Sequence, residues 1–149
     1  MKKIFLLFVL LVISTTSYAT ENKDYYYWGN LDDGGIKSIV PYPKDSQAWG
    51  KRIKVNPSSY GKYLGYSVFI KTTNVNYKVR PYIFLEDKYE KHIKTKWGQT
   101  IKGTTSWKRY YTPHIYVPPH AKSMVIGVQI NGTGKVEFYD YKLKEYSYQ

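Results

Sequence analysis

The residues best suited to chemistry in this 149-residue chain are its aromatic side chains, which comprise 18 Tyr, 4 Trp and 5 Phe. A single core of this size cannot absorb so many rings, so we expect several of them to reach the surface. An exposed ring packs against the flat C–H face of a pyranose sugar, while planar polar side chains can bond the sugar hydroxyls. This composition favours binding of carbohydrate over chemical conversion of it.

Two tryptophans are the strongest candidates for a stacking platform. Trp49 and Trp97 lie in or beside predicted loops, where an indole ring stays accessible to a ligand. Trp107 begins a predicted strand and fits a packing role better. Packing remains the alternative for Trp49 and Trp97 as well, because large rings are mostly buried in folded proteins.

The charge of the chain is strongly lopsided, with 23 Lys and Arg against 11 Asp and Glu and a formal net charge of +12. The longest polar stretch carries a predicted electrostatic patch of Lys88, Lys91, Lys94 and Lys96. Such an excess attracts polyanions of the cell envelope, whether acidic polysaccharide, lipopolysaccharide phosphate, teichoic acid or anionic lipid head groups. The alternative is a Lys-rich surface that only keeps the protein soluble. Nucleic acid is not an expected partner, because no recognised binding motif is present and export is predicted.

The arrangements that catalysis requires are missing from the sequence. There is no Cys, and His92, His114 and His120 have neither metal-binding nor triad spacing. A glycosidase needs two carboxylates at a fixed separation across the sugar, whereas the pairs Asp32-Asp33 and Glu86-Asp87 are typical of solvated turns. We therefore predict no enzymatic activity, no cofactor and no metal.

Residues 1–19 have the three parts of a signal peptide. Lys2 and Lys3 form the charged start, Ile4–Ile13 is an apolar run, and Ser17-Tyr18-Ala19 offers small residues for cleavage. The apolar run is shorter than the roughly 20 residues of a membrane-spanning helix, which favours cleavage near Ala19 over an uncleaved anchor. The protein would then be exported to the periplasm or the medium.

The remaining part, residues 20–149, is long enough for one domain with a single core. It has no Cys, so an exported form would have to be stable without disulfides. No second long apolar run follows the first, and stable membrane insertion is therefore not expected. Frequent Tyr, Val and Ile favour strands over helices.

Apolar and polar residues alternate in short runs bounded by turn residues, which predicts an all-β chain of about eight antiparallel strands in a sandwich. Glu86–Gln99 is the longest polar excursion and predicts a loop over one rim of the sandwich. The predicted strands are Tyr25–Trp28, Ile36–Val40, Trp49–Val55, Lys62–Thr72, Val75–Glu86, Tyr110–Val117, Met124–Asn131 and Lys135–Leu143.

Three motifs in the C-terminal third resemble the last strands of galactose-binding-like jelly-roll domains. They are Gly103-Thr104-Thr105-Ser106-Trp107, Val117-Pro118 and a tight hairpin turn at Gly132-Thr133-Gly134. Gly61–Thr72 resembles a further segment of the same domains, so that the resemblance covers about Trp49–Leu143. It implies a jelly-roll β-sandwich, the fold of many carbohydrate-binding modules, and a fold does not by itself carry a function.

The resemblance also implies where a ligand would bind. Similar modules hold their ligand in a concave groove, into which Tyr82 and Gln129 would point from central strands, with Arg80 beside them. Some relatives hold a structural Ca²⁺ with the help of two adjacent Asp residues in the last strand, where this chain has Tyr139-Asp140. A hard cation needs several oxygen ligands, so no calcium site is carried over.

Together these features predict an exported, non-catalytic module that binds carbohydrate, with an anionic glycan as one option. Its candidate ligand-binding residues are Trp49, Arg80, Tyr82, Trp97 and Gln129. The alternative is a cell-envelope module of the same fold with a structural role or a protein partner docked on an aromatic patch. The sequence leaves the oligomeric state open.

Overall fold

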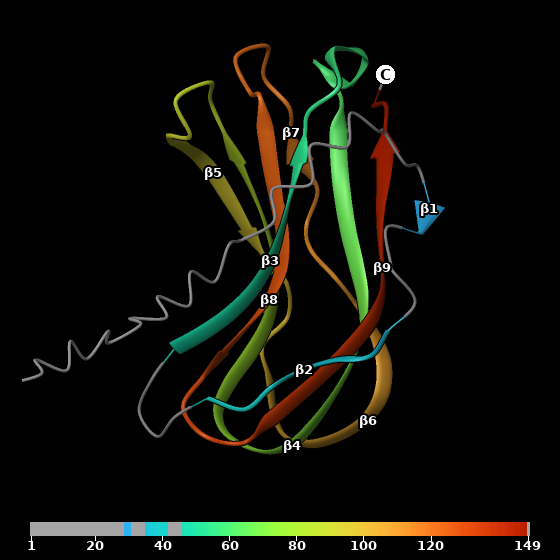
Figure 1. The fold of residues 1–149 in the computed structure, drawn as a ribbon. Coiled ribbons are helices and arrows are strands. Elements are labelled where there is room, and N and C mark those ends of the chain that lie inside the picture. The colour runs from blue at the N-terminus through green and yellow to red at the C-terminus, as the bar shows by residue number, and fades with distance from the viewer. Residues whose placement is uncertain (1–28, 31–34, 42–45, 149) are drawn as a thin grey trace, which may run out of the picture.

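The computed structural model describes residues 29–30, 35–41 and 46–148, and this part of the chain is built from antiparallel strands and their connections (Figure 1). The predicted signal peptide at 1–19 and the first predicted strand, Tyr25–Trp28, lie outside the described residues. No helix in the described ranges is long and apolar enough to cross a membrane.

The described residues form nine strands, and every pair of neighbouring strands is antiparallel. A short 3₁₀ turn at Pro57–Ser59 lies between the third and fourth strands. This confirms the prediction of an all-β antiparallel sandwich. The strands are β1 (Gly29–Asn30), β2 (Lys37–Ile39), β3 (Ser46–Lys54), β4 (Tyr63–Glu86), β5 (His92–Trp97), β6 (Ile101–Tyr111), β7 (Ile115–Tyr116), β8 (Ser123–Asn131) and β9 (Lys135–Tyr146).

The 24-residue strand β4 organises both layers of the sandwich. It joins two predicted strands, Lys62–Thr72 and Val75–Glu86, through a bend at Asn74, where φ is +51°. Before the bend, β4 pairs with β9 on one side and with β6 and β7 on the other. After the bend it pairs with β8 and β5, and its pairing with β6 continues at Val75 and Val79. We call the first set of strands, with β1 and β2, the β9 layer, and the second set, with β3, the β8 layer.

The hydrophobic core lies between the two layers and is formed by alternate side chains of the long strands. In β4 the side chains of Leu64, Tyr66, Val68 and Ile70 are at most 1% exposed, and the residues between them are only partly buried. This alternation is what a half-buried strand requires, because successive side chains point to opposite faces. Ile83 and Leu85 continue the buried row beyond the bend, joined by residues of β8 and β9 such as Ile126, Val128, Val136 and Phe138.

The hairpin between β8 and β9 packs against the bend of β4. Gly132 and Gly134 have φ values of +88° and +112°, a backbone conformation that suits glycine. The backbone N–H of Thr133 donates a 2.7 Å hydrogen bond to the side-chain oxygen of Asn76. The predicted turn is thus confirmed.

The predicted rim loop at Glu86–Gln99 is wrong in part, because residues 92–97 form strand β5 along the free edge of the second half of β4. An edge strand needs apolar residues on only one side and tolerates Lys on its surface. Ile93 packs against the core, and the lysines around it made the segment resemble a loop.

Candidate functional site

Four of the five predicted ligand-binding residues lie on the outer face of the β8 layer. Arg80 of β4 is paired with Gln129 of β8, and Tyr82 of β4 is paired with Trp97 of β5. Directly paired residues project to the same face of a sheet, and so do residues two apart on one strand. We call this cluster of Arg80, Tyr82, Trp97 and Gln129 the Trp97 face.

Two glycines hold the phenol of Tyr82 close to the backbone of the sheet. A Cβ atom on either Gly50 or Gly127 would come within 2.6 Å of the tyrosine hydroxyl oxygen. The hydroxyl donates a 3.2 Å hydrogen bond to the carbonyl oxygen of Trp49, and the ring of Phe84 runs nearly parallel at a centroid distance of 5.9 Å. Burial raises the pKa of Tyr82 to about 12. The phenol therefore forms a fixed part of the floor of the Trp97 face.

Above this floor, Trp97 and Arg80 are stacked on each other. The guanidinium carbon of Arg80 lies 4.0 Å from the centroid of the indole, which is 37% exposed. The Nε atom of Arg80 is buried and finds no hydrogen-bond partner within the described part of the chain. The side-chain amide of Gln129 donates to the hydroxyl of Ser46 at 3.0 Å. The face thus combines an accessible ring, a cation and a planar amide.

Trp49, the fifth candidate, points to the other side of the sheet. It is paired with Val128, whose side chain is fully buried, and its ring lies 5.2 Å from Phe138 and 5.1 Å from Tyr141. The thickness of the β8 layer separates it from the Trp97 face. Trp49 contributes its carbonyl oxygen to the site, and its indole packs against the core.

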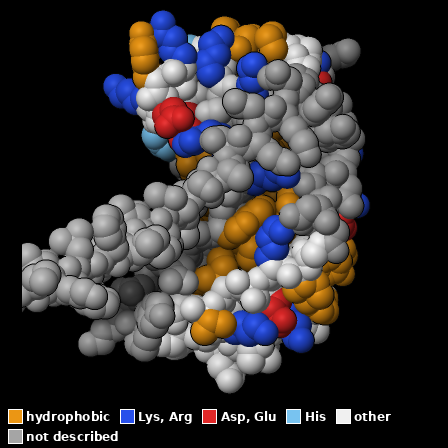
Figure 2. Space-filling model, in the orientation of Figure 1, with side chains coloured by type: hydrophobic (Ala, Val, Ile, Leu, Met, Phe, Trp, Pro, Cys, Tyr) orange, Lys and Arg blue, Asp and Glu red, His pale blue; other side chains and the backbone are white. Residues whose placement is uncertain are grey.

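The four lysines of the predicted patch all lie on the β4–β5 hairpin. Lys88 and Lys91 belong to the turn, whereas Lys94 and Lys96 alternate with Trp97 along β5 and so point to the opposite side of that strand. Lys and Arg side chains gather at the upper end of the molecule in Figure 2, where Figure 1 places this hairpin. The patch is therefore beside the Trp97 face and not part of it.

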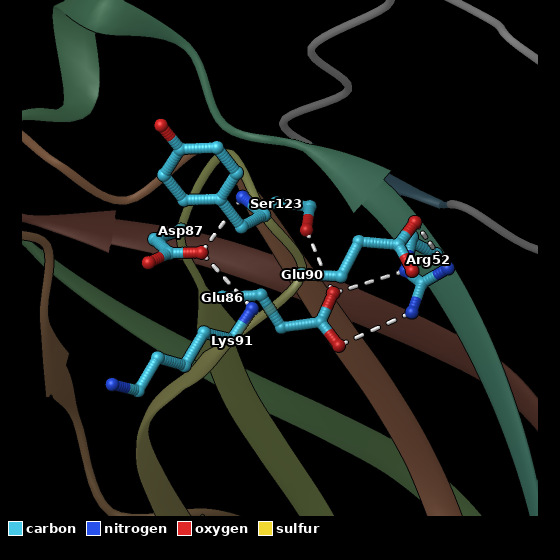
Figure 3. A network of polar contacts seen from close by, with 7 residues as sticks. Arg52, Glu86, Asp87, Glu90, Lys91 and Ser123 are labelled. Atoms are coloured by element: carbon cyan, nitrogen blue, oxygen red, sulfur yellow. Dashed lines mark hydrogen bonds and ion pairs between the residues drawn. The ribbon is translucent and has the colours of Figure 1, made fainter.

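An ion pair between the partly exposed Arg52 and a buried carboxylate closes one end of the β8 layer (Figure 3). Glu86, only 5% exposed, accepts hydrogen bonds from Nε and Nη2 of Arg52 at 3.0 and 3.1 Å and from the hydroxyl of Ser123 at 2.8 Å. The hydrogen bond to Glu86 raises the pKa of Arg52. Glu90 adds a 3.2 Å contact to the same guanidinium. Glu86 is thus a buried partner of Arg52, which corrects its interpretation as a solvated turn residue.

Asp87 does have the predicted role in a turn. Its Oδ1 atom accepts hydrogen bonds from the backbone N–H groups of Tyr89 and Lys91 at 2.8 and 2.9 Å. These bonds, first of all the one from Lys91, lower the pKa of Asp87. The second carboxylate pair, Asp32-Asp33, lies outside the described residues.

A second candidate site, which the sequence did not predict, lies on the outer face of the β9 layer. It is a cleft of about 860 Å³ centred on Gly65 and Ser67 of β4, and we call it the Gly65 cleft. Clefts of roughly 300–1,000 Å³ are the usual size for small-ligand sites. Its lining includes Gly65, Ser67, Tyr111, His114, Lys142 and Lys144.

A β-bulge at Asp140 brings the two lysines into this cleft. Asp140 has a φ of +49°, and the register between β4 and β9 shifts there by one residue. The extra residue reverses the alternation of β9. Tyr141 and Leu143 consequently face the core, and Lys142 and Lys144 face outwards. Arg109 fixes the bulge by bonding both the carbonyl oxygen and the carboxylate of Asp140.

Aromatic rings surround the Gly65 cleft. The rings of His114 and Tyr146 are stacked at a centroid distance of 3.8 Å beside Gly65, and Nδ1 of His114 contacts the hydroxyl of Tyr148. Tyr111 of β6, which is paired with Ser67, is 63% exposed. Tyr116 and Tyr148 are also exposed, as the aromatic excess in the sequence predicted. The signal for this site was present in the alternating Lys142, Lys144 and Tyr146, but their side of the sheet depends on the bulge.

Solved structures of similar fold include carbohydrate-binding modules. The enzymatically active domain of tailspike protein 4 of bacteriophage CBA120 matches with a TM-score of 0.56 and 13% identity over 75% of this chain, which spans only 18% of that one. A CBM4 structure matches with a TM-score of 0.53 and 15% identity over 76% of this chain and 72% of that one. The C-terminal family 22 carbohydrate binding module of Clostridium thermocellum Xyn10B has a TM-score of 0.47 and 14% identity, over 80% and 91% of the two chains.

The tailspike and CBM4 matches establish a shared fold. At such low sequence identity they show nothing beyond the fold. They confirm the resemblance to a galactose-binding-like jelly roll of the kind found in carbohydrate-binding modules. No protein-family model matches the chain, and no curated protein matches its sequence.

Proposed function

We propose that this protein is an exported, non-catalytic module that binds carbohydrate at the Trp97 face. The observation that carries the proposal is the arrangement of Arg80, Tyr82, Trp97 and Gln129 on three neighbouring strands. Trp97 offers an accessible ring for the C–H face of a sugar, and Arg80 and Gln129 offer donors for its hydroxyls. Tyr82, held by its glycines, keeps the floor rigid, so little side-chain freedom is lost on binding.

The fold supports this choice of ligand class. A CBM4 structure shares the architecture over most of both chains, and the Trp97 face spans the neighbouring strands β8, β4 and β5 of one layer. Carrying the ligand class of such a protein over to this chain is part of the proposal, because function resides in the site and not in the fold.

The pairing of the carboxylates supports a non-catalytic role. Each Asp or Glu in the described ranges already bonds a cation, a hydroxyl or a backbone N–H. Glu86 and Asp140 are tied by Arg52 and Arg109, and Glu145 by Lys62 and Ser59. A pair that splits a glycosidic bond needs one carboxylate free to donate a proton and another to attack or to activate water.

A glycan array probed with the exported protein tests the binding proposal. Trp97→Ala should abolish retention of the glycans bound by the wild type, because the stacking surface is removed. Tyr89→Ala, which removes another highly exposed ring from the neighbouring hairpin, should leave retention unchanged. Both variants should keep the melting temperature of the wild type. Undiminished retention by Trp97→Ala would refute the assignment of the site.

Export rests on the sequence of residues 1–19 and needs its own test. The protein recovered outside the cytoplasm should begin at Thr20 when its N-terminal residues are determined by mass spectrometry. An N-terminus at Met1 would show that the apolar run is retained and that the predicted cleavage near Ala19 is wrong.

A further inference from the structure

We propose that the Gly65 cleft is a second glycan site, selective for sugars that carry a carboxylate or a sulfate. It does not depend on the Trp97 face, because it lies on the other layer of the sandwich. Gly65 and Ser67 belong to the first half of β4, whereas Arg80 and Tyr82 belong to the second half. The two sites can therefore be tested separately.

The cleft has a floor of small residues between a cation and a ring. Ser67 is paired with Lys142 of β9 on one side and with Tyr111 of β6 on the other, so the three side chains form one row across the sheet. Adjacent strands are about 4.8 Å apart, which places the outer two Cα atoms of the row about 10 Å from each other. That span accommodates one or two sugar rings lying across the floor.

The ring surfaces suit the apolar faces of sugars. Tyr111 is 63% exposed, and the stacked pair of His114 and Tyr146 stands beside Gly65 at the next row. Aromatic rings in such positions contribute large contact area with few rotatable bonds. A side chain at Gly65 would begin to crowd both stacked rings, with a Cβ atom 3.0 Å from each.

The charges in the cleft favour an anionic ligand. Arg109 and Asp140 neutralise each other, and Glu145 is paired with Lys62 at 2.6 Å. Lys142 makes only a 3.5 Å contact with the Asp140 carboxylate that Arg109 already holds. Lys144 has no carboxylate partner within the described part of the chain and lies 5.2 Å from the ring of Tyr146. The cleft thus carries an excess of positive charge next to its rings.

Ser67 adds a directional donor to this site. Its hydroxyl oxygen accepts a 3.1 Å hydrogen bond from Nη1 of Arg109, which leaves the hydroxyl proton available to a ligand. A carboxylate or sulfate above Ser67 would meet this proton and the ammonium group of Lys142 together. Bonds of this charge-assisted kind are stronger than those between neutral groups.

Calorimetric titration with matched glycans tests the inference on the whole exported protein. Oligogalacturonate is compared with its methyl ester, which removes only the charge, and dextran sulfate is compared with dextran. We expect the wild type to bind one or both charged probes and to bind the uncharged partner of that probe at least about tenfold more weakly. The carboxylate and sulfate arms identify which anion the cleft prefers.

Two pairs of variants locate the site. The double variant Lys142→Ala/Lys144→Ala should lower affinity for the charged probe about tenfold, whereas Lys88→Ala/Lys91→Ala removes the same charge from the β4–β5 hairpin and should change it little. Tyr111→Ala should weaken binding more than Tyr77→Ala, which removes another exposed ring.

Four outcomes would overturn the inference: no binding of either charged probe, equal affinity for the charged and uncharged probes, equal loss in the two double variants, or equal loss in the two tyrosine variants. Trp97→Ala separates this inference from the proposed function, because it should leave binding of the charged probe intact. Loss of the neutral-glycan signal in Trp97→Ala, with the charged probe still bound, would support both sites. If Trp97→Ala changes nothing at all, the proposed function fails while the cleft stands.

Discussion

The phenol of Tyr82 lies directly over the backbone of Gly127. A Cβ atom at Gly127 would come within 2.6 Å of both Cζ and the hydroxyl oxygen of Tyr82 and would clash with the carbonyl oxygen of Trp49. The absence of a side chain at this position is therefore what allows the ring to rest on the sheet. It also keeps β3 and β8 at their normal spacing.

Gly127→Ala should destabilise the protein by roughly 1–3 kcal/mol, because the methyl group displaces the Tyr82 ring or the β3 backbone in a packed region. Urea denaturation followed by tryptophan fluorescence measures the change in the free energy of unfolding. Gly35→Ala is the matched control, since a Cβ atom there would find no heavy atom within 4 Å. Equal stabilities of the two variants would show that the ring is not seated as described.

Tyr82 should ionise later than an ordinary tyrosine, because burial raises its pKa to about 12. A raised pKa means that folding favours the neutral phenol. Its contribution to stability is complete below the unfolded value of about 10 and is lost as the pH rises towards 12. When tyrosinate formation is followed by ultraviolet absorbance as the pH is raised, the Tyr82→Phe variant should lack the late phase seen in the wild type. Tyr89→Phe, which removes a hydroxyl at an exposed position, should keep that late phase.

Arg52→Ala should destabilise the protein by about 1–3 kcal/mol, because Glu86 is left buried without its cation. The half-exposed guanidinium and access to water keep the loss below that of a fully buried pair. Glu90→Ala removes only an exposed partner of Arg52 and should have an effect of less than about 1 kcal/mol. Denaturant unfolding of Arg52→Ala, Glu86→Gln and the double variant gives the coupling. The double variant should lose less free energy of unfolding than the two single variants lose together. Simple additivity of the two losses would contradict the ion pair.

Asp87→Asn should make the stability of the hairpin less dependent on pH in acid. The pKa of Asp87 is lowered in the fold, so the stabilising contribution of the charged carboxylate is present above the unfolded pKa of about 3.9 and is lost as the pH falls through the folded value. Melting temperatures of the wild type and Asp87→Asn should therefore converge as the pH is lowered from neutrality to below that range. A difference that stays constant with pH would exclude the carboxylate as the cause.

Alternation in the sequence placed Arg80 and Tyr82 on one face of their strand, because a regular strand fixes which side each residue takes, and the resemblance to jelly-roll modules added Gln129 from another strand. Trp49 was proposed as a platform because it lies beside a predicted loop, although it alternates with Ile53 and Val55, and all three side chains pack in or against the core. The strand β5 was missed because its pairing with β4 depends on a free sheet edge, which local composition does not encode. The Gly65 cleft was missed because the bulge at Asp140 reverses the alternation of β9, and the partner that fixes it, Arg109, is 31 residues away in the sequence.

The strand β4 gives its first half to one layer and its second half to the other. Opening either layer must therefore detach a strand that also anchors its counterpart, and a partly open intermediate would have little to hold it together. We expect the slowest-exchanging amide protons of β8 and β9 to exchange only through global unfolding. The highest protection factors in the two strands should therefore be equal. The module should thus withstand proteases as a single all-or-none unit, a useful property for a protein without disulfides.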